Sequence, residues 1–237
     1  SDGLAISPRS GREQCERIVD ALADQIVGIC SHIPSNEASE LLTSSDHFDR
    51  DVAWIVGNSS LRRSQLLVHA GSSLTLCSGA PIKTDMYRCG AIMYGILEPD
   101  LGFRPTMELK ANVVSVGDYP CGSTVGYDRS VTLESDRQLA CISVGYANGF
   151  SRNAVTPYVI INGERAKVIG KTSMNTIVAD VSNMNGVDIG VPATVFGGNG
   201  NTKIGIVDAE TTFNSIMADL YTDWGLRNCR RYRSEPR

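Results

Sequence analysis

The stretch "ISVGYANGFSRN", residues 142–153, places Tyr146 in a turn between an apolar run and a polar loop. Such a phenol can pack against the protein or exchange a proton with a bound molecule. Because a tyrosine has an ordinary pKa of about 10, a tyrosine base needs positive charge or hydrogen-bond donors beside it. His32 in "GICSHIPSNE" follows a predicted strand, and Arg88 in "DMYRCGA" ends another. Taken singly, the three have ordinary alternatives: a packed tyrosine, a structural histidine and a surface ion pair.

Composition limits the class of protein. With 237 residues, 26 acidic against 22 basic side chains and 42% hydrophobic residues, we expect a globular protein of one or two domains. No basic block interleaved with aromatic residues is present, which argues against nucleic acid as a partner. No apolar run approaches the roughly 18 residues of a membrane helix, so we expect no membrane partner. The chain starts at Ser1 rather than at Met, which indicates a processed, tagged or truncated product.

The cysteines give no sign of a metal site. There are seven of them, an odd number, and they form no CxxC pair and have no histidine at a metal-binding spacing. We therefore expect free thiols and no metal.

The chain changes character near residue 105. Before it, helical and strand patterns alternate: "REQCERIVDALAD" spaces Ile18, Val19 and Leu22 on one helical face, and "QIVGIC" and "QLLVHA" are typical of buried parallel strands. After it come short β-runs with turns between them, Asn162-Gly163 being a strong hairpin signal. The late stretch "TTFNSIMADLYTDWG" is predicted to form one helix that returns to the first domain.

The predicted architecture is α/β plus all-β. Residues 1–106 hold only three or four strand candidates, whereas a (β/α)8 barrel needs eight strands and usually about 250 residues. The sequence therefore predicts a partial (β/α)8 TIM-barrel segment over 1–106, followed by a C-terminal β domain over 107–237.

Several motifs carry a family resemblance. "ISVGYANGFSRN" followed by "VIINGERAKVIGKTSMNTIVADVS" resembles the C-terminal domain of alanine racemases, fold-type III pyridoxal phosphate enzymes with a barrel and a β domain. "GSTVGYDRSVTLESDR", "SMNT" and "ADLYTDWG" are similar to broad-specificity and basic amino-acid racemases of that family. The resemblance is dense over about residues 66–225 and covers the C-terminal two thirds of a family member. It implies amino-acid racemisation with pyridoxal 5'-phosphate as cofactor.

The resemblance also implies catalytic roles. Racemisation needs bases on opposite faces of the substrate, usually a lysine and a tyrosine. By resemblance, Tyr146 is the tyrosine and acts on the cofactor of the other subunit of a dimer. By the same resemblance, His32 is a partner of that tyrosine and of Arg88, and Arg88 faces the ring nitrogen of the cofactor. Because a guanidinium keeps its proton, Arg88 would leave that nitrogen unprotonated and favour racemisation over transamination.

Binding roles follow from the same resemblance. "HAGSSLTL" is similar to the family's His-Ala-Ala-Asn-Ser motif and offers the Ser73 hydroxyl to the cofactor phosphate. Gly90 and Ala91 would add backbone amides, and Tyr221 a phenol. Met174 and Asn175 resemble the segment that lines the substrate carboxylate. Under the structural alternative, Met174 is a core residue.

Two departures from the family pattern stand out. The family's cofactor lysine lies in a Lys-Ala-(Asp/Asn)-Ala-Tyr-Gly motif, and no lysine of this chain has that context: Lys83, Lys110, Lys167, Lys171 and Lys203. Ile6 stands where a family member has an arginine near the cofactor's phenolic oxygen, and Arg9 could replace it only with an insertion in the loop.

Two interpretations remain open. In the first, the chain is the C-terminal part of a racemase of small-molecule amino acids, and works as a homodimer or with an N-terminal fragment that carries the lysine. In the second, it is a catalytically inactive racemase-like binding or structural module. Retention of so many site-type residues favours the first.

Overall fold

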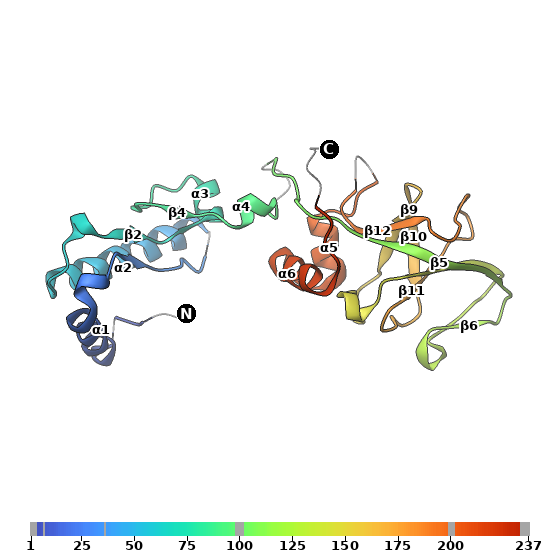
Figure 1. Ribbon diagram of the computed structural model, residues 1–237, viewed down its shortest axis with the longest axis horizontal. Coiled ribbons are helices and arrows are strands. Elements are labelled where there is room, and N and C mark those ends of the chain that lie inside the picture. The colour runs from blue at the N-terminus through green and yellow to red at the C-terminus, as the bar shows by residue number, and fades with distance from the viewer. Residues whose placement is uncertain (1–3, 7, 36, 98–101, 199–201, 233–237) are drawn as a thin grey trace. The chain divides into compact units, whose positions relative to one another are not determined.

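The computed structural model describes residues 4–6, 8–35, 37–97, 102–198 and 202–232 (Figure 1). The chain divides into two compact units, unit 1 over Ser1–Met93 and unit 2 over Tyr94–Arg237, and each is described by itself. Among the described residues, no helix is both long and apolar enough to cross a bilayer.

Unit 1 alternates helices with short strands. In chain order its elements are α1 (Arg9–Leu22), η1 (Ala23–Gln25), β1 (Gly28–Cys30), α2 (Ala38–Gly57), η2 (Arg63–Gln65), β2 (Leu67–His69), β3 (Gly71–Ser72), α3 (Ser73–Ser78), β4 (Tyr87–Arg88) and, at the boundary, α4 (Ala91–Tyr94). β1 pairs with β2 in parallel, and β3 pairs with β4 in parallel. The strands predicted in "QIVGIC" and "QLLVHA" are confirmed.

The buried face of α1 differs from the predicted one. Cys15 and Val19 are buried, whereas Ile18 and Leu22 are 40% and 43% exposed. Ile6 packs against the side of α1 that carries Cys15 and Val19, which leaves Ile18 outside the cluster. Leu22 is the last residue of the helix and is not covered either. The face of α2 follows its spacing, since three of its apolar residues are buried: Phe48, Val52 and Ile55.

Unit 2 is built on a closed antiparallel barrel with strand order β10-β11-β8-β5-β12-β9 (Figure 1). Its strands are β5 (Leu109–Tyr119), β8 (Arg137–Ile142), β9 (Tyr158–Ile161), β10 (Glu164–Ile169), β11 (Ile177–Asp180) and β12 (Pro192–Phe196), with β6 (Thr124–Val125) and β7 (Val131–Thr132) as a separate hairpin. Two short 3-10 turns, η4 (Tyr127–Arg129) and η5 (Tyr146–Asn148), lie between strands. The β domain predicted after residue 105 is confirmed.

The Asn162-Gly163 turn joins β9 to β10 as predicted. Both residues have positive φ, 51° and 84°, and Glu164 pairs with Ile161 across the turn. A two-residue turn of this hand matches the twist of antiparallel strands and favours Asn-Gly. This turn therefore fixes the register of β9 against β10.

The tail is two helices rather than the single predicted one. α5 (Ile206–Phe213) ends before Asn214, whose φ of 49° is left-handed, and α6 (Met217–Arg227) follows. Asparagine adopts that conformation at low cost and so ends a helix. Met217 and Trp224 are each 1% exposed within the barrel core, which groups α6 with unit 2 instead of the first domain.

Candidate active site

The residues predicted for the site are divided between the two units. Unit 1 holds His32, Ser73, Arg88, Gly90 and Ala91, and unit 2 holds Tyr146, Met174, Asn175 and Tyr221. Two local groups of side chains result, one around Arg88 and one around Tyr146.

Arg88, the last residue of β4, reaches the ends of β1 and β2. Its Nη2 donates to the carbonyl of Ser31 at 2.7 Å, and its Nη1 donates to the carbonyl of His69 at 3.3 Å. Nη1 lies 2.5 Å from Nδ1 of His69, and Nη2 lies 3.4 Å from Nδ1 of His32. The structure therefore brings Arg88 and His32 together at the carboxyl ends of parallel strands, where catalytic groups gather in α/β folds.

His69 belongs to this group, although the sequence-based site omits it. A guanidinium has only donors, so Nδ1 of each histidine must accept, and the proton of a neutral imidazole then sits on Nε2. Arg88 therefore orients both imidazoles at once. The sequence contained a sign of this role. His69 opens "HAGSSLTL" at the end of one predicted strand, just as His32 follows the end of another predicted strand.

Ser73, Gly90 and Ala91 lie at the starts of two short helices. Ser73 begins α3 and is 4% exposed, and its hydroxyl oxygen accepts from the amide of Ile92 at 3.4 Å, which leaves its own proton for donation. Ala91 begins α4. A Cβ built on Gly90 would meet no atom within 4 Å, so the chain borders open space there. This is the room that a phosphate bound by backbone amides needs.

The Tyr146 turn is held by the segment predicted to line the substrate. The amide of Tyr146 donates to the carbonyl of Ser173 at 3.0 Å, and the amide of Ala147 donates to the carbonyl of Met174 at 2.9 Å. A Cβ on Gly145 would lie 2.4 Å from both carbonyl oxygens, so only glycine permits this approach. Tyr146 itself is 37% exposed, and Met174 is 52% exposed rather than a core residue. Tyr146 and Met174 are thereby brought together, with their side chains accessible.

A second tyrosine, Tyr127, shares the neighbourhood of Tyr146. The guanidinium carbon of Arg152 lies 5.9 Å from the ring centres of both Tyr127 and Tyr146, which places one positive charge beside two phenols. Tyr127 is 58% exposed. The sequence-based site omits it, although its stretch, "GSTVGYDRSVTLESDR", is one of those that carry the resemblance.

The backbone after Tyr127 is unusual. Asp128 and Arg129 have φ values of 59° and 51°, a left-handed conformation that Asp tolerates but that is costly for Arg, and that gathers at functional sites. Lys171 Nζ holds Asp128 at 2.5 Å, and this hydrogen bond, with the further positive charge of Arg152, lowers the pKa of the Asp128 carboxyl. The ion pair thus fixes the turn that presents Tyr127.

The side chain of Tyr221, on α6, makes contacts with other residues of unit 2. Its phenol oxygen accepts from the amide of Met107 at 3.3 Å, and its ring meets Phe196 edge-on at 5.9 Å. Burial raises the pKa of Tyr221. The phenol therefore keeps its proton near neutral pH and can donate a hydrogen bond.

The residues present fit part of a pyridoxal phosphate site. The Arg88 group offers a fixed donor for a ring nitrogen, and open space borders Gly90. Three of the five lysines form ion pairs with carboxylates: Lys83 with Asp49, Lys110 with Glu108 and Lys171 with Asp128. Ile6 is buried in the α1 cluster, and no group of three metal ligands occurs in the part of the chain that the structure describes.

Comparison with known proteins places these features in a family. Residues 106–232 match the family described as "Alanine racemase, C-terminal domain". The chain is 34% identical over 232 residues to the broad specificity amino-acid racemase of Vibrio parahaemolyticus, covering 98% of the chain and 57% of that protein. It is 32% identical over 232 residues to the lysine racemase of Proteus mirabilis, covering 97% of the chain and 56% of that protein. The chain thus spans less than two thirds of the length of these relatives.

Solved structures share the fold. The alanine racemase of Streptomyces coelicolor superposes with a TM-score of 0.83 at 24% identity, over 93% of this chain and 61% of that one. An alanine racemase of Bartonella henselae with covalently bound pyridoxal phosphate superposes with a TM-score of 0.76 at 21% identity, over 95% of this chain and 62% of that one. The match to the C-terminal domain, together with the 34% identity to the Vibrio racemase, shows that the chain belongs to the alanine racemase family.

Proposed function

We propose that this chain is the part of an amino-acid racemase that supplies a tyrosine base and part of the site for pyridoxal 5'-phosphate. One observation carries the proposal: 98% of the chain matches a relative named as an amino-acid racemase, at 34% identity. The geometry supports it with an arginine that orients two histidines in unit 1 and with two accessible tyrosines around Arg152 in unit 2.

The proposal includes the domain arrangement. Residues 1–106 are the C-terminal portion of a (β/α)8 barrel, and residues 107–237 are the β domain of alanine racemase type. The parallel pairing of β1 with β2, with α2 between them in the chain, is the repeating unit that such a barrel uses. The antiparallel closed sheet of unit 2 supports the second half.

In the proposed site, Arg88 donates to the ring nitrogen of the cofactor, and Ser73, Gly90, Ala91 and Tyr221 hold its phosphate. When bound, pyridoxal phosphate withdraws electrons from the α-carbon of the amino acid and so makes its proton easier to remove. A guanidinium that keeps its proton leaves the ring nitrogen unprotonated. Contacts to Ser31 and His69 fix Arg88 for this role before any ligand arrives.

A tyrosine moves the α-proton on one face of the substrate. Tyr146 is the candidate predicted from the sequence, with His32 and Arg88 as its partners, and Tyr127 is the candidate that the structure adds. Tyr127 is more exposed and precedes the left-handed, ion-paired residue Asp128. Tyr146 is tied to Met174, which with Asn175 we propose to line the substrate side. Arg152 lies beside both phenols and would stabilise the negative charge that either phenol carries as a base.

The second base, a lysine, comes from outside this chain. The proposed active assembly is a homodimer or a complex with an N-terminal portion that carries the lysine. The substrates are small-molecule amino acids, since the relatives are named broad specificity and lysine racemases. The competing proposal, an inactive racemase-like module, rests on the missing lysine and on Ile6.

The test is α-proton exchange in the native protein with the N-terminal portion that it naturally carries. Incubation of single enantiomers in deuterium oxide with pyridoxal phosphate should give the opposite enantiomer, deuterated at the α-carbon. Neutral and basic amino acids should both be assayed by chiral chromatography and mass spectrometry. Neither racemisation nor exchange with any of them would favour the inactive module.

A second experiment locates the lysine. Borohydride reduction fixes a pyridoxyl group on the lysine that carries the cofactor, and peptide mass spectrometry identifies it. We expect the label on a lysine outside this chain. A stoichiometric label on Lys83, Lys110, Lys167, Lys171 or Lys203 would show that this assignment is wrong.

A further inference from the structure

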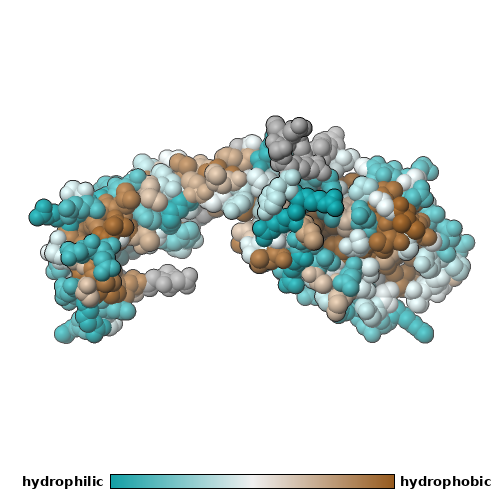
Figure 2. All heavy atoms as spheres, in the orientation of Figure 1, coloured by the Kyte–Doolittle hydropathy of each residue, from teal (hydrophilic) through white to brown (hydrophobic). Residues whose placement is uncertain are grey.

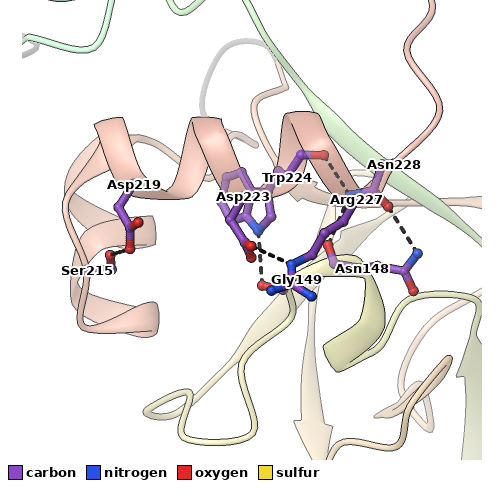
Figure 3. A network of polar contacts seen from close by, with 8 residues as sticks. All are labelled: Asn148, Gly149, Ser215, Asp219, Asp223, Trp224, Arg227 and Asn228. Carbon is purple, nitrogen blue, oxygen red and sulfur yellow. Dashed lines mark hydrogen bonds and ion pairs between the residues drawn. The ribbon is translucent and has the colours of Figure 1, made fainter.

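The turn that carries Tyr146 is tied to the end of α6 by a reciprocal pair of amide side chains (Figure 3). Nδ2 of Asn148 donates to Oδ1 of Asn228 at 3.1 Å, and Nδ2 of Asn228 donates back to the carbonyl of Asn148 at 3.0 Å. Oδ1 of Asn148 meanwhile accepts from the amide of Gly145 at 3.2 Å, across the base of the turn. Asn148 therefore joins the turn's own closure to a residue 80 positions later in the chain.

A second tie runs beside the first. Nε1 of Trp224 donates to the carbonyl of Gly149 at 3.1 Å (Figure 3). Trp224 is 1% exposed and packs between Phe196 and Phe213, each at 5.5 Å between ring centres. Gly149 has a φ of 86°, and a Cβ there would lie 2.6 Å from the Trp224 ring, so the turn fits the indole only with glycine. The buried indole thus fixes the position of the turn relative to the barrel core.

We propose that Asn228 is a positioning residue for Tyr146 and, through the 146–152 loop, for Arg152. This inference rests on the proposed racemase function. The Ser173 and Met174 carbonyls hold the amides at the start of the turn, and the Asn148–Asn228 pair holds its last residue. With both ends fixed, the backbone from which the Tyr146 side chain extends keeps its place, and small misplacements of a reacting group cost large factors in rate.

The contacts of Asn228 exceed what a helix cap requires. Its Nδ2 donates to the carbonyl of Trp224 at 2.9 Å, which satisfies an end carbonyl of α6. The two bonds to Asn148 add nothing to the helix and are directed at the turn. At the other end of α6, the hydroxyl of Ser215 donates to Asp219 at 2.6 Å without touching the turn (Figure 3). Ser215, which lies just before α6, is therefore a matched control at the other end of the same helix.

The experiment compares Asn228→Ala with Ser215→Ala in the native, assembled protein. Amide hydrogen exchange over residues 145–150 reports the turn, and steady-state kinetics with a racemised amino acid report the chemistry. In Asn228→Ala we expect faster exchange in that segment and a kcat about tenfold lower, with KM little changed, because only the aim of the base is relaxed. Ser215→Ala should change neither quantity. Asn228→Asp should affect both quantities at least as strongly as Asn228→Ala, because it places a carboxylate oxygen against the carbonyls of Asn148 and Trp224 in place of a donor.

The outcomes separate this inference from the proposed function. Unchanged exchange at 145–150 in Asn228→Ala would overturn the tie itself. Faster exchange with a normal kcat, in a protein that Tyr146→Phe inactivates, would overturn the positioning role and leave the base intact. If Tyr146→Phe retains full activity, the role of Tyr146 in the proposed function fails, and a lower kcat in Asn228→Ala would no longer support positioning of that phenol.

Discussion

The two units differ in whether the edges of their sheets are paired. In unit 2, each barrel strand pairs on both sides, so the closed sheet leaves no open edge. In the described part of unit 1, β1 pairs only with β2, and apolar side chains beside these strands remain uncovered: Val27 is 74% exposed and Leu67 is 53% exposed. Figure 2 shows hydrophobic surface on this unit. The barrel of unit 2 thus covers its own strand edges, whereas the described part of unit 1 leaves strand edges and apolar side chains open.

The difference extends to how the functional side chains are held. Arg88 depends on the ends of separate short strands and on two histidine rings. The Tyr146 turn depends on backbone bonds within unit 2 and on α6, whose Trp224 lies in the barrel core. The Tyr146 site should therefore survive separation of the units, whereas the Arg88 site should not.

The largest expected effect follows from expressing the units separately. Residues 94–237 should fold, with dispersed NMR signals and a cooperative thermal transition, because the barrel buries its own core. Residues 1–93 should lack a cooperative transition and should associate, because open strand edges and exposed apolar residues favour pairing with other chains. Circular dichroism and light scattering measure both properties. A stable, dilution-resistant monomer of 1–93 would break the comparison.

The next effect is on rate. Tyr146→Phe and Tyr127→Phe each delete one phenol from an exposed side chain, so the thermal midpoint should change little. Loss of the general base should lower kcat/KM by about 10²- to 10⁴-fold. The fall must be equal from both enantiomers, because the equilibrium constant between them is one. Exchange of the α-proton with solvent should instead be lost from only one enantiomer, since the other gives its proton to the lysine.

Tyr119→Phe provides the control for both variants. Tyr119 is an exposed tyrosine of the same barrel, at the end of β5 and outside the candidate site, so its phenol should be dispensable. If both site variants racemise at the wild-type rate, neither tyrosine is a base. If only one fails, that residue is the base, and the other helps to shape the site.

The third effect tests where stability resides. Ile161 is fully buried in β9, and Ile161→Ala should lower the free energy of unfolding by about 2–5 kcal/mol through the cavity that it leaves. Val27→Ala, at an exposed position of unit 1, should change it by no more than about 0.5 kcal/mol. Urea denaturation measures both. A large effect of Val27→Ala would mean that another part of the assembled protein covers this residue, and would support the proposal that unit 1 is part of a larger barrel.

The sequence predicted features that depend on local chemistry. The Asn162-Gly163 hairpin followed from turn preferences, and the strands of the barrel followed from short apolar runs. Three features depended on contacts distant in sequence and were missed. His69 joins the site only because β2 pairs with β1. Tyr127 and Tyr146 share the positive charge of Arg152. The buried face of α1 packs against Ile6 and Ile55, which lie outside that helix. Asn214, a residue that often ends helices, was present in the sequence. The prediction followed instead the apolar pattern, which continues through Asn214.

The smallest expected effect compares one carboxylate in each unit. The pKa of Asp85 in unit 1 is lowered by a hydrogen bond from Arg63 at 2.8 Å and by another from the amide of Val68 at 2.7 Å. The pKa of Asp128 in unit 2 is lowered chiefly by Lys171. Since both folded pKa values lie below the unfolded ones, each group stabilises the fold above the unfolded value of about 3.9, and this contribution is lost as the pH falls through the folded pKa.

The two carboxylates should respond differently when their partners are removed. Arg63→Gln should raise the pKa of Asp85 only partly, because the Val68 amide remains, whereas Lys171→Gln should bring the pKa of Asp128 close to its ordinary range. Salt at about 1 M should likewise raise the pKa of Asp128 more, since exposed ion pairs are screened and a backbone hydrogen bond is affected less. Carboxylate NMR titration of the intact protein measures each value. An equal response of the two groups would show that the Val68 bond does not hold Asp85, and that the β2 edge of unit 1 is as loosely fixed as an exposed turn.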